Sequence, residues 1–307
     1  MNDVRRSWYE FAFDKAFQTK NGSAFQEFFW DIMEMCHPGD FQRVKPWGQD
    51  GDMKNDGYLK SERILFQVYA PEKMVQEKAI SKIETDFNGA LPHWKDYFDQ
   101  WVFTHNARYG LGARIHRRLL ELENDNLGLK CTTWGYSELR NKLFNLRDIE
   151  IASILGPSLS LQDMLDTGYP ELKIILDVIS AKEPMENQDL RPVSNEKISS
   201  NALSPSVKEL INFGRIKAPY VDRFFREYHD PEYGDKIAKA FKDKYIELRN
   251  QKLPPDTIFM MLEDFAAGPL RQPPKNESAV LAVLSYLFEK CDIFERPRME
   301  DGHDSTY

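Results

Sequence analysis

Apolar residues recur at helical spacing at the start of the chain and at strand spacing soon afterwards. Trp8, Phe11 and Ala16 mark the apolar face of a first helix, and residues 25–33 repeat the pattern in a second. The segment 37–40 contains Pro and Gly, which end helices, and predicts a stop there. The spacing then changes to alternation over residues 41–46, which favours a short extended segment.

The next hundred residues alternate between strand and helix patterns. Residues 55–59 and 64–70 predict two strands of a hairpin joined by residues 60–63. The elements expected after them are a helix over 73–87, a strand over 100–104, a helix over 111–123, a strand over 129–133 and a helix over 137–144. This order predicts an α/β domain with a mixed sheet flanked by helices.

The rest of the chain is typical of helices without strands. Residues 148–179 have an irregular helical pattern, and residues 182–205 are rich in Pro and Ser, as linkers are. Helical spacing returns over 233–248, 258–265 and 280–287. We therefore expect an α/β domain over residues 1–150, a helical connector and linker over 151–204, and an all-helical domain over 205–307.

Composition narrows the classes of function and location. The chain has 307 residues with 41 basic and 49 acidic side chains, so its net charge is −8. An acidic chain does not bind nucleic acid through bulk charge, and any such contact requires a local basic surface. The sequence contains no apolar run of 18 residues and no signal-peptide core, which excludes a membrane span. The three cysteines are far apart in the sequence and lack zinc-ligand spacing. Because an odd number of distant cysteines suits a reducing compartment, we expect a cytoplasmic protein.

The segment Gly51-Asp52-Met53-Lys54-Asn55-Asp56-Gly57, with Gln67-Val68-Tyr69 after the hairpin loop, carries candidate chemistry. On adjacent strands, the side chains of Asp56 and Gln67 and the carbonyl of Val68 are expected to converge on one hard cation, with Asp52 as a further ligand. Mg²⁺, or Mn²⁺ in its place, prefers such oxygen ligands and keeps several waters. The ion would polarise a phosphodiester and acidify a bound water.

The spacing of the same motif resembles that of PD-(D/E)xK restriction-endonuclease-like nucleases. The branch of this family that the sequence resembles has a first motif like Gly-Asp-Gly-Gly-Ile-Asp and a second motif like Gln-x-Lys. The resemblance implies a restriction-endonuclease-like mixed sheet, an endonuclease activity and an accessory acid on an early helix, for which Glu27 is the candidate. Tyr69 stands where the usual nuclease has lysine, so Lys54, on the face of Asp56, is the best local substitute for that charge.

The stretch around Tyr69 resembles a more particular group, the nuclease effectors of bacterial ABC-three-component defence systems, including the Lamassu-type nuclease subunit. In that group the tyrosine form of the motif is usual. Residues 233–245 and 253–262 resemble the small helical domain fused to such effectors, and the resemblance covers about 5–145 and 205–295. It implies an SMC-like or Rad50-like ATPase partner, a small third subunit, and degradation of invading phage or plasmid DNA.

DNA binding by an acidic chain requires basic residues beside the site. Arg114, Arg117 and Arg118 lie on one expected helix and are the candidates for phosphate contacts, although such a run is also typical of a solvated face. Since a single-metal site cuts one strand at a time, we also expect a homo-oligomer. The alternative interpretation is a catalytically inactive nucleic-acid-binding scaffold of the same kind of complex. An RNA substrate remains open, because no base-reading motif is present.

Overall fold

The chain forms two compact units. The computed structural model describes residues 3–44, 53–180, 197, 201–268, 273–290 and 293–294. One unit, the sheet domain, spans Ala12–Gly156, and the other, the helical domain, combines Met1–Phe11 with Pro157–Tyr307. Helix α1 (Asp3–Thr19) therefore contributes its first turns to the helical domain and its last turns to the sheet domain. Most of the expected linker over 182–205 lies outside the described residues.

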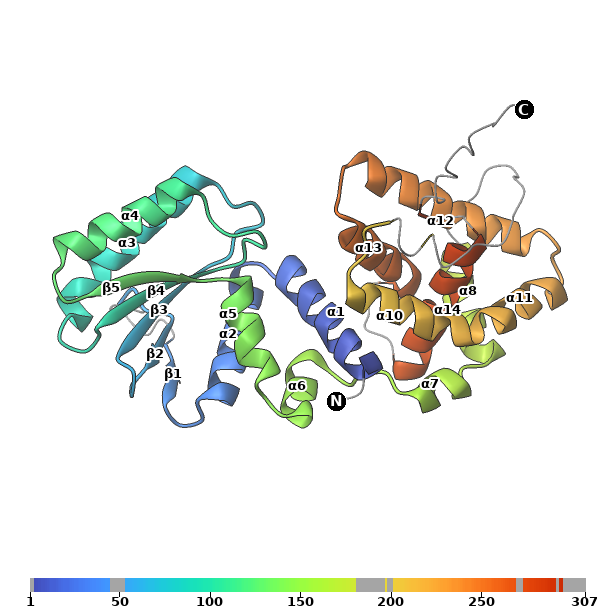
Figure 1. Ribbon diagram of the computed structural model, residues 1–307, viewed down its shortest axis with the longest axis horizontal. Coiled ribbons are helices and arrows are strands. Elements are labelled where there is room, and N and C mark those ends of the chain that lie inside the picture. Colours follow the sequence, from blue (N-terminus) through green and yellow to red (C-terminus); the bar gives the residue numbers. More distant parts are fainter. Residues whose placement is uncertain are drawn as a thin grey trace, which may run out of the picture. The chain divides into compact units, whose positions relative to one another are not determined.

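The sheet domain is a five-stranded sheet with helices on both faces (Figure 1). Its further elements are α2 (Gly22–Cys36), β1 (Phe41–Arg43), β2 (Gly57–Leu59), β3 (Ile64–Tyr69), α3 (Gln76–Trp94), β4 (Gln100–His105), α4 (Ala113–Asp125), β5 (Lys130–Trp134), α5 (Tyr136–Phe144) and α6 (Asp148–Leu155). Helices α3 and α4 lie on one face of the sheet, and α2 and α5 lie on the other.

The sheet is mixed, in the strand order β1-β2-β3-β4-β5. The first three strands form an antiparallel meander, in which Leu59 pairs with Ile64 across the tight connection. Strands β3, β4 and β5 are parallel, with α3 and α4 as the crossover helices that parallel strands require. The predicted hairpin and the α/β class are thus confirmed.

Alternation along β3 buries the sheet on both faces. Leu65 belongs to the apolar cluster that α3 and α4 form with β4, in which Trp101 and Phe103 are fully buried. Phe66 points the other way, toward α2, and its ring lies 5.3 Å from that of Phe29. Because helices cover both faces of the sheet, polar side chains at the ends of β2 and β3 are partly buried.

The helical domain surrounds one central helix, α14 (Pro274–Lys290), whose residues from Glu277 to Phe288 are all buried. A helix that is buried on every side must be enclosed by others. These are α7 (Leu161–Asp166), α8 (Tyr169–Ser180), α10 (Pro205–Gly214), α11 (Ala218–Glu227) and α13 (Pro255–Ala267), with the short 3₁₀ helix η1 (Arg215–Lys217). Helix α12 (Tyr233–Asn250) packs mainly on α8 and α13. The described part of this domain contains no strand, which confirms the predicted all-helical class.

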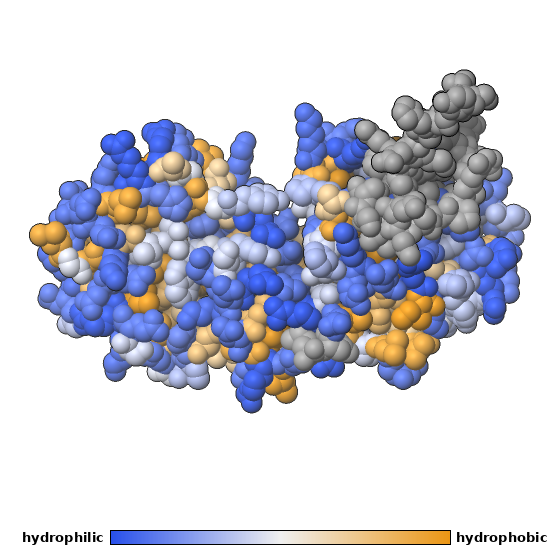
Figure 2. Space-filling view, in the orientation of Figure 1, coloured by the Kyte–Doolittle hydropathy of each residue, from blue (hydrophilic) through white to orange (hydrophobic). Residues whose placement is uncertain are grey.

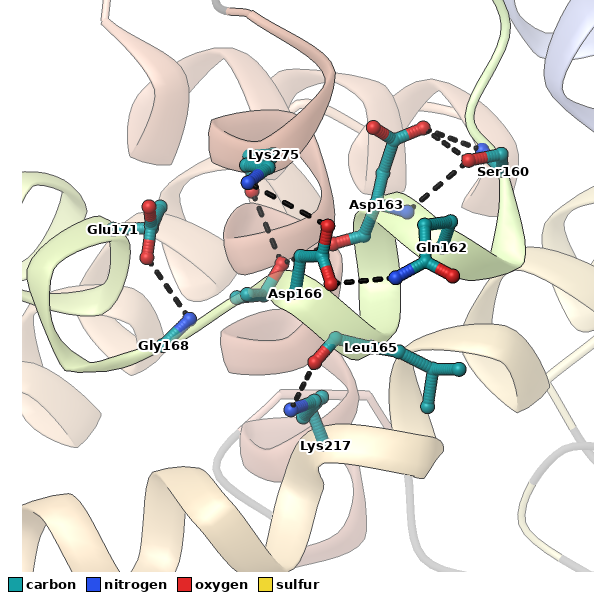
Figure 3. Close-up of polar contacts among 10 residues, drawn as sticks. Ser160, Gln162, Asp163, Leu165, Asp166, Gly168, Glu171, Lys217 and Lys275 are labelled. Atoms are coloured by element: carbon teal, nitrogen blue, oxygen red, sulfur yellow. Dashed lines mark hydrogen bonds and ion pairs between the residues drawn. The ribbon is translucent and has the colours of Figure 1, made fainter.

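Helix α7 is short, and polar contacts fix both of its ends (Figure 3). At its start, Ser160 Oγ accepts a hydrogen bond from Asp163 N at 3.1 Å, and Asp163 Oδ2 accepts one from Ser160 N at 3.0 Å. This reciprocal cap satisfies donors that a helix leaves unpaired. At its end, Lys217 Nζ donates to the carbonyl of Leu165 at 2.9 Å. The Lys217 contact holds the end of α7 against η1, while the side chain of Leu165 stays 51% exposed.

The surface is mostly polar. Figure 2 shows hydrophilic side chains over most of the visible face of each domain, with smaller apolar groups between them. Among the described residues, we find no helix whose length and apolar character would let it span a bilayer.

Candidate active site

Asp56 lies where the hairpin opens, immediately before β2. Its amide donates to Phe66 O at 2.9 Å, so the ladder of β2 and β3 continues for one residue beyond the strand. Its carbonyl accepts a hydrogen bond from Trp30 Nε1 of α2 at 2.6 Å. These bonds place the side chain of Asp56 opposite Gln67 in the register, and only 7% of the residue is exposed.

Three hydrogen bonds hold the Asp56 carboxylate. Gln26 Nε2, from α2, donates to Oδ1 at 2.6 Å. Gln67 Nε2 donates to Oδ2 at 2.5 Å, and the amide of Val68 donates to the same oxygen at 2.7 Å. Hydrogen bonds to the ionised form favour a charged carboxylate. The structure therefore brings together Asp56, Gln67 and the main chain of Val68.

The donor set around Asp56 fits a hard cation. Gln67 is 4% exposed, and its Oε1 has no hydrogen-bond partner in the described part of the chain. A buried oxygen without a partner is costly, and a cation would satisfy it. The described residues contain no cluster of three His, Cys, Asp or Glu side chains. Asp56, the amide oxygen of Gln67, a carbonyl such as that of Val68 and several waters would therefore hold the ion, which is how Mg²⁺ is commonly bound.

The other candidates have different surroundings. Asp52 lies outside the described residues. Lys54 Nζ is 3.4 Å from Asp86 Oδ1 of α3. The ring of Tyr69 packs 5.8 Å from that of Phe103, against the cluster under α3 and α4. Glu27 is exposed on α2, and the residue before it contacts the Asp56 carboxylate instead.

The three arginines of α4 are all ion-paired. Arg114 lies 3.1 Å from Glu77, Arg117 lies 3.1 Å from Glu121, and Arg118 lies 2.7 Å from Glu84 and 3.0 Å from Glu121. Exposed pairs of this kind are weak, so a phosphate can displace the carboxylates. The pairing also ties α4 to α3.

Two residues that surround the site were not expected from the sequence. Trp30 is one of the apolar residues of α2. The sequence pattern does not show whether such a tryptophan only packs or also donates a hydrogen bond, as Trp30 does to Asp56. Asp86 did leave a signal, since it occupies the apolar face that Ala79, Ile83 and Ala90 define on α3. A carboxylate at such a position calls for a buried partner.

His105, at the end of β4, is buried and neutral. It is 4% exposed, and burial lowers its pKa to about 4. Its Nδ1 accepts a hydrogen bond from the amide of Ala107 at 3.2 Å. At neutral pH this ring therefore supplies no positive charge for a phosphate.

The neutral state of His105 predicts a pH-dependent stability. An unfolded chain takes up this proton near pH 6.5, whereas the folded one does so only near pH 4, so acid favours the unfolded state between these values. We expect His105 to account for a loss of about 2 kcal/mol in the free energy of unfolding between pH 7 and pH 5. Urea unfolding at both values, compared with His105→Gln, measures it. An equal pH dependence in the two proteins would contradict it.

Comparison with known proteins bears on the helical domain. Residues 170–295 match the family model of C-terminal domain 10 of the ABC-three component (ABC-3C) systems. The helical domain is therefore similar to that family over this range, which is less than half of the chain. No curated protein and no solved structure matches the chain.

The matched range begins in α8 and covers α10 to α13 together with the central helix α14, whereas α7 lies before it. The Asp56 cluster lies outside it, in the sheet domain.

Proposed function

We propose that the chain is the nuclease effector of an ABC-three component defence system, with its nuclease site at Asp56. The observation that carries this proposal is the convergence of the Asp56 carboxylate, the Gln67 side chain and the Val68 main chain at the open end of the hairpin. The mixed sheet with helices on both faces agrees with the restriction-endonuclease-like fold that the motif implies. We further propose double-stranded DNA as the substrate and a Lamassu-type assembly with an SMC-like or Rad50-like ATPase and a small third subunit.

The residues around Asp56 have separate roles in this proposal. Mg²⁺ bound there supplies a Lewis acid for the scissile phosphate and lowers the pKa of a water. Gln26 fixes one oxygen of Asp56, and Val68 N fixes the other, so the carboxylate is held before substrate arrives. Gln67 Oε1, which has no hydrogen-bond partner in the described part of the chain, would be a further oxygen ligand for the ion. Lys54 supplies the positive charge that stabilises the developing phosphorane.

A catalytically inactive scaffold is the second candidate, and one observation favours it. Both oxygens of Asp56 already accept hydrogen bonds from protein groups, from Gln26 to Oδ1 and from Gln67 and Val68 to Oδ2. A carboxylate satisfied in this way can be structural. The same fold would then bind nucleic acid through the arginines of α4 without cutting it.

Plasmid digestion by the chain, purified with its partner subunits, distinguishes the two functions. Supercoiled DNA is incubated with Mg²⁺, Mn²⁺, Ca²⁺ or EDTA, and an RNA duplex of the same length is the second substrate. The nuclease proposal expects cleavage of DNA in Mg²⁺ and Mn²⁺ only. DNA binding without cleavage under every condition would instead establish the scaffold.

A further inference from the structure

A fully buried carboxylate lies on the sheet-facing side of α3. Asp86 has no exposed surface, and it is flanked on that face by Ile83, Phe87 and Ala90. Burying an ionised carboxylate is unfavourable unless cations compensate it. The role of Asp86 therefore depends on which cations meet it.

Two lysines from different elements meet Asp86. Lys82, one turn earlier on α3, lies 2.7 Å from Oδ2. Lys54, from the segment before β2, lies 3.4 Å from Oδ1. Their side chains are 35% and 43% exposed, so each amine also reaches solvent. The Lys54 contact connects α3 to the segment that carries Asp56, two residues later.

A glycine makes room for Lys54 on the surface of α3. Gly89 lies inside this helix, where glycine is unfavourable because of its backbone freedom. A Cβ at this position would lie 2.7 Å from Cγ of Lys54. The lysine stem therefore crosses the helix at Gly89, and the amine reaches Asp86 one turn away.

The backbone of Lys54 requires such an anchor. Met53 and Lys54 have φ angles of +50° and +61°, which side chains other than glycine rarely adopt. Conformations of this kind persist where the surroundings over-determine them. The contact with Asp86 and the space at Gly89 supply that constraint immediately before Asn55 and Asp56.

We propose that Asp86 and Gly89 form a seat on α3 that fixes Lys54 and, through it, the position of the Asp56 carboxylate. Asp86 is thus a positioning residue for the Asp56 site and touches no substrate. This inference rests on the proposed function for its catalytic consequence. The contacts that form the seat can be tested without measuring DNA cleavage.

The readout is the amide of Val68, which donates to Asp56 Oδ2 and reports where the carboxylate lies. Asp86→Asn keeps the size of the side chain and removes its charge, and both lysines can turn to solvent. We expect hydrogen exchange at Val68 in the metal-free protein to become about tenfold faster, since a weakened contact opens more often. We also expect plasmid cleavage to fall by 10- to 100-fold, as is typical when a supporting contact is lost.

Two further variants separate positioning from general stability. Gly89→Ala keeps every charge but collides with the Lys54 stem, and it should reproduce both effects of Asp86→Asn. Lys82→Gln removes the other partner of Asp86 and leaves the seat, so exchange at Val68 and cleavage should match the wild type. The thermal midpoint is measured for each protein to show that the fold persists.

The possible results are distinguishable. Wild-type exchange at Val68 in both Asp86→Asn and Gly89→Ala would overturn the seat, whatever the cleavage rates. Faster exchange in both variants, with normal exchange in Lys82→Gln, supports it. If exchange changes as expected but no protein, including the wild type with its partners, cuts DNA, the seat stands and the nuclease proposal fails.

Discussion

Replacing Asp56 by asparagine is expected to lower the rate of Mg²⁺-dependent plasmid cleavage by about a thousandfold, because the only carboxylate among the described residues that converges on Gln67 loses its charge. The shape of the side chain is kept. The Gln26 amide can turn to accept from the new Nδ2, while the asparagine oxygen takes the place of Oδ2 and accepts from Val68 N. Folding should therefore be affected little, and the loss should appear in the cleavage rate under saturating DNA.

The matched control for Asp56→Asn is Asp40→Asn. Asp40 accepts a hydrogen bond from the amide of Ser61 at 2.9 Å. Ser61 lies in the connection that precedes β3, whereas Gln67 lies near the other end of that strand. Cleavage by this variant should equal that of the wild type. Undiminished cleavage by Asp56→Asn would remove Asp56 from the mechanism, and a comparable loss in both variants would point to damage of the hairpin as a whole.

Replacing Gly214 by alanine is expected to destabilise the helical domain by about 3 kcal/mol. Gly214 ends α10, where this helix crosses the central helix α14, and a Cβ there would collide with the main-chain carbonyl of Leu281 and with Oγ of Ser285. That hydroxyl already donates to Ile211 O at 2.9 Å. Backbone atoms cannot turn aside as a side-chain end can, so the two helices must separate.

Thermal unfolding of the whole chain measures the Gly214→Ala effect, with an expected fall of about 10 °C in the midpoint of the helical domain. Gly168→Ala is the matched control, because the nearest atoms to its added Cβ lie at an ordinary 3.5 Å. Co-purification with the partner subunits is measured in parallel. A midpoint equal to that of the control would show that α10 and α14 are not closely packed at this position.

The sequence was sufficient for the parts of the fold that depend on local periodicity. The change from helical to alternating spacing after Asp40 located the meander, and the segment 60–63 located its connection. The residues that share a face of each strand followed as well, since successive side chains of a strand point to opposite faces. The convergence of Asp56 with Gln67 was expected for the same reason, because partners in a hairpin lie opposite each other.

Contacts between distant segments could not be predicted in this way. The seat of Lys54 joins residues 54, 86 and 89, and it depends on where α3 crosses the sheet, which no local pattern encodes. The assignment of residues 1–11 to the helical domain has a similar cause. Phe11 and Phe13 are both apolar, and only the tertiary structure shows that Phe11 packs on Phe259 while Phe13 packs on Tyr136.

The division of α1 between two domains has a consequence for synthesis. Trp8 Nε1 donates to Pro157 O at 3.2 Å, and the ring of Phe11 lies 5.9 Å from that of Phe259. A ribosome adds about 5–20 residues per second. Phe259 is therefore synthesised on the order of 12–50 s after Phe11. During that interval the apolar side of the first helix is open to chaperones, and the helix is anchored only after α13 has been made.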